Sequence, residues 1–131
     1  MYQYESIIST VKENFPEIEI YKMQLLEPEL VDWIINDDSP YIFFPVFWRL
    51  LEYALMGKVK NDGLANRIFC FMENMAYSDS MVRNLMKIEM LEPLFALDYD
   101  TYEKVITQHL QPKTRDIFNE LLPLFDVPRK N

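Results

Sequence analysis

The apolar residues of this chain recur mostly at helical spacing. The first such segment ends before Pro16 and follows the i, i+3, i+4, i+7 pattern of one helix face, with Tyr4, Ile7, Ile8, Val11 and Phe15. Ile18 and Ile20 alternate in the next stretch, which hints at a short strand. A many-stranded sheet is disfavoured, because the chain has only two glycines and tight hairpins favour glycine at positions of positive φ.

Prolines mark the start of the next two helices. Pro28 suits the first turn of a helix that continues to Ile35 and ends in the polar residues 36–38. Ser39 and Pro40 then form an N-cap followed by proline at the first helical position.

Pro45 leaves two alternatives for the helix that starts at residue 40. Either residues 41–44 form an irregular lead-in, or the helix is kinked, since an internal proline lacks the backbone donor and clashes with the preceding turn. From Val46 the helical pattern is clear, and Gly57 ends it.

The second half of the chain predicts four further helices, over residues 64–75, 81–91, 100–110 and 112–125. Asn61 or Asp62 caps the first of them, and Asp98 or Asp100 caps the third. The first two are joined by the short polar turn 78–80 and should pack antiparallel. We therefore expect one compact all-α domain over residues 1–131, with six to seven helices packed largely as antiparallel pairs.

Composition supports a stable core and implies no oxidising compartment. Half of the residues are hydrophobic and 15% are aromatic, which excludes an intrinsically disordered chain. The single cysteine, Cys70, cannot form an internal disulfide. The start lacks the basic and then apolar pattern of a secretory leader, and the longest apolar run, residues 41–48, is far below the roughly 20 residues of a bilayer-spanning helix. We expect a soluble cytoplasmic protein.

Charge is distributed very unevenly along the chain. Residues 1–46 contain nine acids and two bases, whereas the rest of the chain is almost neutral, for a total net charge of −8. Such a potential attracts cationic partners and repels phosphate backbones. We therefore expect a basic protein partner, and neither nucleic acid nor membrane as a ligand.

Catalytic and metal-binding patterns are missing from the sequence. The one histidine, His109, has no ligand-type residue at i+4, and Cys70 lies between two phenylalanines, where cysteine behaves as a small hydrophobe. Residues 98–109 resemble the start of a calcium loop, but Glu103 replaces its glycine and His109 replaces its final glutamate. We expect no enzyme activity, no metal and no cofactor, and rank a metal-dependent hydrolase built from scattered carboxylates last.

The acidic third offers the best candidate for a binding surface. Acids beside aromatics form protein-binding sites, because charge speeds the encounter and buried aromatics hold the complex. The alternative is that the aromatics belong to the core and the acids only keep the domain soluble. The candidate partner-binding residues are Glu27, Glu29, Asp32, Asp37, Asp38 and Tyr41.

Methionines and phenylalanines suggest a second type of binding protein. Core filling is the preferred interpretation of the methionines at helical spacing, which include Met72, Met75, Met81, Met86 and Met90. The alternative is a helical adaptor that uses Met- and Phe-rich helix faces to hold another helix.

One stretch resembles a known kind of domain. Residues 67–79 (RIFCFMENMAYSD), followed by Val82-Arg83-Asn84 and Leu91-Glu92-Pro93-Leu94, are similar to an uncharacterised family of small bacterial helical domains. The resemblance covers residues 64–97 and leaves the acidic third outside. Some similar proteins act as immunity proteins for secreted toxins, many of which are cationic nucleases. The resemblance implies a non-enzymatic cytoplasmic protein that neutralises such a toxin by direct binding, and it assigns no catalytic residue.

Overall fold

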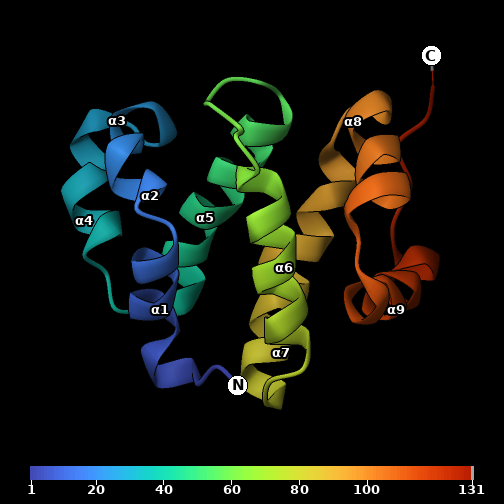
Figure 1. The fold of residues 1–131 in the computed structure, drawn as a ribbon, viewed down its shortest axis with the longest axis horizontal. Coiled ribbons are helices and arrows are strands. Elements are labelled where there is room, and N and C mark those ends of the chain that lie inside the picture. The colour runs from blue at the N-terminus through green and yellow to red at the C-terminus, as the bar shows by residue number, and fades with distance from the viewer. Residues whose placement is uncertain (131) are drawn as a thin grey trace.

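Helices form all the regular secondary structure of residues 1–130, the part of the chain that the computed structural model describes (Figure 1). Asn131, the last residue of the predicted domain, lies outside the described residues. The α-helices within residues 1–130 are α1 (Ile7–Asn14), α2 (Glu17–Ile20), α3 (Lys22–Leu25), α4 (Val31–Ile35), α5 (Pro40–Leu55), α6 (Leu64–Ala76), α7 (Ser80–Met86), α8 (Tyr99–Lys104) and α9 (Pro112–Leu121).

Short helical segments of other types extend several of these helices. Two π-helical segments, Lys87–Leu91 and Val105–His109, continue α7 and α8. The 3₁₀ segments are Tyr4–Ser6, Pro28–Leu30, Glu92–Ala96 and Leu122–Leu124. The expected all-α class is confirmed, but the predicted six to seven helices are too few, since residues 1–130 contain nine α-helices.

The hint of a strand after Pro16 was wrong, because this stretch forms the one-turn helices α2 and α3. Ile18 is buried and Ile20 is 70% exposed. Residues two apart lie about 200° apart around a helix and so point to nearly opposite sides. One buried and one exposed isoleucine at this spacing therefore fit a helix as well as a strand.

The helix α5 runs without interruption through Pro45, so the irregular lead-in was the wrong alternative. Ser39 occupies the N-cap position, but its hydroxyl makes no capping hydrogen bond. Instead, the backbone N–H of Ser39 donates to Oδ1 of Asp37 over 2.7 Å and fixes the turn into the helix. Gly57 follows the helix end with φ of 72°, a backbone conformation that favours glycine.

Acidic and amide side chains cap the later helices. Asp79 accepts a hydrogen bond from the N–H of Val82 at the start of α7. Of the two predicted caps of α8, Asp98 is the one used, through the N–H of Thr101. Neither predicted residue occupies the N-cap of α6, which is Gly63, although Oδ1 of Asn61 accepts from the N–H of Ala65 over 2.8 Å.

A single hydrophobic core joins the acidic third to the rest of the molecule. Three phenylalanines meet at its centre, with ring centroids 5.0 Å apart between Phe15 and Phe47, 5.4 Å between Phe15 and Phe71, and 5.7 Å between Phe47 and Phe71. These rings connect the end of α1 to α5 and α6.

Most of the methionines considered above fill this core. Met81 is exposed, whereas the other four are fully buried: Met72, Met75, Met86 and Met90. Phe43, Phe44 and Phe47 of α5 are also fully buried. These seven side chains therefore pack within this chain.

The elements are arranged so that the acidic third lies at one end of the molecule (Figure 1). Helices α2, α3 and α4 lie at that end, α6 crosses the middle, and α8 and α9 lie with the C-terminus at the other end. The five predicted acids precede α5 in the chain and lie between residues 27 and 38.

Candidate protein-binding surface

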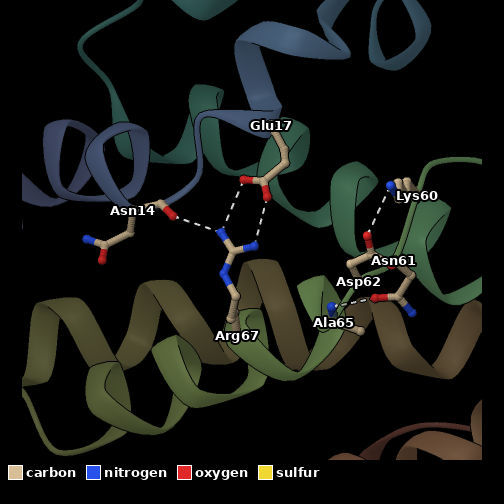
Figure 2. Close-up of polar contacts among 7 residues, drawn as sticks. All are labelled: Asn14, Glu17, Lys60, Asn61, Asp62, Ala65 and Arg67. Carbon is tan, nitrogen blue, oxygen red and sulfur yellow. Dashed lines mark hydrogen bonds and ion pairs between the residues drawn. The ribbon is translucent and has the colours of Figure 1, made fainter.

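Two acids of the first third are neutralised by bases. Arg67 of α6 donates from Nη1 to Oε2 of Glu17 over 2.8 Å and from Nη2 to Oε1 over 3.2 Å (Figure 2). This hydrogen bonding lowers the pKa of Glu17 against the opposing effect of burial. Glu19 pairs with Lys22 over 3.1 Å. The charge near α2 is thus compensated locally.

The five predicted acids form no ion pair within residues 1–130. The remaining base of the first third, Lys12, donates from Nζ to the carbonyl of Ile35 over 2.6 Å, at the end of α4. Asp37 is half-buried and holds the Ser39 N–H, while the other four acids are exposed: Glu27, Glu29, Asp32 and Asp38. We call these five residues the acidic face.

Trp33, next in sequence to Asp32 of the acidic face, is exposed. Val31 and Ile35 are buried and fix the inner side of α4, so Trp33, two residues from each, points outward and is 60% exposed. Tryptophan is enriched among the residues that contribute most to protein–protein binding. The sequence interpretation missed it, although its position between two core residues at i and i+4 spacing was a usable signal.

An apolar groove lies beside the acidic face. It has an open volume of about 210 Å³, between α3, α4 and the Pro28–Leu30 turn on one side and α5 on the other. We define the apolar groove by its lining residues: Leu25, Leu26, Glu27, Leu30, Ile34, Ile42, Pro45, Val46 and Arg49.

The α5 wall of the groove is one stripe of the helix. Ile42, Pro45, Val46 and Arg49 follow the i, i+3, i+4, i+7 spacing of a single face. Arg49 donates from Nη1 to the carbonyl of Leu25 over 3.3 Å, so its guanidinium satisfies the end of α3. The groove is therefore bounded by side chains from several separate elements, which sequence reasoning about one helix at a time did not bring together.

Tyr41 lies on a different side of α5 from that stripe. It is next in sequence to Ile42, but its neighbours include Tyr4 and Glu89, which lies in the π-helical segment Lys87–Leu91. Burial first, and then these two neighbours, raise the pKa of the Tyr41 phenol. Among the predicted partner-binding residues, Tyr41 thus faces Tyr4 and Glu89, neither of which belongs to the acidic face.

The single histidine and cysteine have structural partners. His109 stacks on Phe69 at 5.0 Å between ring centroids, and its Nδ1 lies 3.0 Å from Oδ1 of Asn66. Burial, and then Lys104, lower the pKa of His109. Cys70 is exposed and accepts a hydrogen bond from Nε2 of Gln111 at 3.1 Å.

Two kinds of site are not found in residues 1–130. No three histidine, cysteine, aspartate or glutamate side chains in this range come together in a way that could hold a metal ion. None of the helices described for these residues has the length and apolar character needed to cross a bilayer.

A family profile described as a domain of unknown function, DUF7674, matches residues 8–124. The chain belongs to the DUF7674 family. This match is much longer than the resemblance over residues 64–97, and the DUF7674 domain includes both the acidic face and the apolar groove. No curated protein and no solved structure matches the sequence.

Proposed function

We propose that this chain is a non-enzymatic binding protein of the bacterial cytoplasm, an immunity protein that neutralises a cationic, nuclease-type toxin by direct contact. The observation that carries the proposal is the contrast between paired and unpaired acids. Glu17 and Glu19 are held by bases, whereas the acidic face has no ion pair within residues 1–130.

The physical argument is electrostatic complementarity. A nuclease needs a cationic surface to bind phosphate groups, and an acidic protein that covers this surface competes with the nucleic acid. Complementary potentials accelerate the encounter, and the exposed Trp33 supplies the kind of contact that slows dissociation. Neutralisation of this kind requires no catalytic group in the binding protein.

The experiment starts from a pull-down with the protein product of the adjacent gene, followed by kinetic measurement of the complex. The triple variant Glu27→Lys, Glu29→Lys, Asp32→Lys reverses three exposed acids of the acidic face. We expect its association rate constant to fall about tenfold or more, because charge reversal removes the steering. Raising the salt from about 50 to about 500 mM should slow association of the unaltered protein in the same way.

The matched control changes net charge equally but at the other end of the molecule. Asp116→Lys, Glu120→Lys, Asp126→Lys also reverses three exposed acids, two within α9 and one after it. This variant should keep an association rate constant within about threefold of the unaltered protein, since distant charges are screened over about 10 Å. Equal losses in both variants would show that only total charge matters, and tight binding that ignores both reversals would refute the proposal.

A further inference from the structure

We propose that the apolar groove receives one aliphatic or thioether side chain of the basic partner, presented on a segment with lysine or arginine beside it. The inference takes the basic character of the partner from the proposed function and adds the contact that fixes the partner's position.

The size of the groove suits a side chain better than a cofactor. Its open volume of about 210 Å³ is below the roughly 300 Å³ at which small-molecule pockets begin. Its lips are Leu30 and Ile42, which come from opposite walls and remain 38% and 37% exposed. Burying these two side chains against an apolar partner group contributes roughly 25 cal/mol per Å² removed from water.

The surroundings of the groove select the charge of the occupant. Glu27 lines the groove and Glu29 follows two residues later, both exposed. Arg49, the base in the lining, is directed at the carbonyl of Leu25. Trp33 is three residues after Leu30, about one helical turn, where its exposed ring can stack with a lysine or arginine.

These charges also argue against a second copy of this chain as the occupant. A second copy would bring the same acidic face toward the groove, and like charges repel. An acidic peptide is disfavoured for the same reason. The occupant that satisfies both the apolar lips and the acids is therefore a basic segment with an apolar anchor.

The test uses the full-length protein, immobilised, to select from phage-displayed random peptides of about 12 residues. We expect selected peptides to carry leucine, isoleucine or methionine with at least two lysines or arginines close by. The variant Leu30→Ser, Ile42→Ser should bind the selected peptides about tenfold more weakly, as truncation of interface anchors does. The control Met81→Ser, Leu124→Ser alters two exposed apolar residues away from the groove and should not change binding.

A second variant distinguishes loss of binding from loss of folding. Ile42→Trp keeps the groove lip apolar but fills the space, so it should retain the helical circular dichroism spectrum and still weaken peptide binding. Selection of basic peptides without an apolar preference, bound equally by the groove variants, would overturn the groove inference and leave the acidic face as the site. Selection of apolar peptides without bases, or of no peptides, would overturn it as well. The proposed function is tested separately by the charge-reversal experiment: slower association of the acidic-face variant supports it, and unchanged association contradicts it.

Discussion

Arg67 of α6 holds Glu17 of α2 through two hydrogen bonds across 50 residues of sequence (Figure 2). The same guanidinium also donates to the carbonyl of Asn14 over 3.1 Å and lies 5.3 Å from the centre of the Phe15 ring. One side chain thus ties the end of α1 and the start of α2 to the middle of the molecule.

Removing this contact should weaken the fold measurably. Arg67→Ala should lower the free energy of unfolding by about 1 kcal/mol, a modest value because the arginine side chain is nearly half exposed. Urea unfolding monitored by circular dichroism measures the change. The control is Lys60→Ala, which breaks the much more exposed pair with Asp62 and should have almost no effect. Equal effects of the two substitutions would show that the Arg67 contact contributes no more to stability than an exposed ion pair.

The same pair gives a defined pH dependence. Because Arg67 lowers the pKa of Glu17 in the folded state, the stabilisation is fully present above the ordinary glutamate pKa and is lost as pH falls through the folded-state value. The difference in unfolding free energy between Arg67→Ala and the unaltered protein should therefore shrink between about pH 7 and about pH 3. A difference that stays constant over this range would exclude the ion pair as its source.

Glu73 should be important for the C-terminal helices. Its Oε1 and Oε2 accept from the N–H groups of Thr114 and Lys113, over 2.8 and 2.9 Å, at the start of α9. Glu73→Ala leaves these donors without their acceptor and removes a negative charge from a helix N-terminus, which should cost about 1–2 kcal/mol. Denaturant unfolding measures this loss of stability. The comparison is Glu120→Ala, at an exposed position later in α9, which should leave the free energy of unfolding almost unchanged.

Glu89 should destabilise the folded state at neutral pH. Burial, and then the nearby Glu92, raise the pKa of this half-buried carboxyl, so its charged form is disfavoured in the fold. Glu89→Gln should therefore raise the free energy of unfolding at pH 7, by about 0.5 kcal/mol. The gain should shrink as pH falls through the raised pKa and vanish below the ordinary glutamate pKa, where the natural side chain is protonated in the folded and the unfolded state alike. Melting temperatures of both proteins across pH would check this, and a gain that persists in acid would argue against it.

Pro45 offers a test of the backbone of α5. As an internal helix residue it lacks the N–H that would bond to the carbonyl of Tyr41, and its own side chain is exposed. Pro45→Ala should raise the free energy of unfolding by about 1 kcal/mol or more, since proline is the least favourable residue inside a helix. The natural comparison is Pro40→Ala, because proline is well tolerated at the first helical position. A loss of stability in Pro45→Ala would show that the helix requires the proline.

The helix class and many helix ends could be predicted from sequence, because the signals involved are local. Asp98 and Gly57 act through their own backbone neighbours, and each was visible as a cap or a terminator. The π-helical segments after α7 and α8 could not be predicted in this way, since their apolar spacing still follows one helix face.

The candidate surface could also be predicted only where the signal is local. The excess of acids was visible by counting, but the local pairing of Glu17 depends on Arg67, 50 residues away. The groove depends on which apolar residues remain partly uncovered after packing. Leu30 and Ile42 had the same apolar character as buried Val31 and Phe43, and only the contact between the elements distinguishes them.

The contact of Phe15, Phe47 and Phe71 fixes the acidic third to the interior of the molecule. Because its apolar residues belong to the same buried core as those of the later helices, this third is an integral part of the domain. A binding event at the acidic face, as proposed above, would therefore lose little chain entropy, because the backbone of this surface is already ordered by the core.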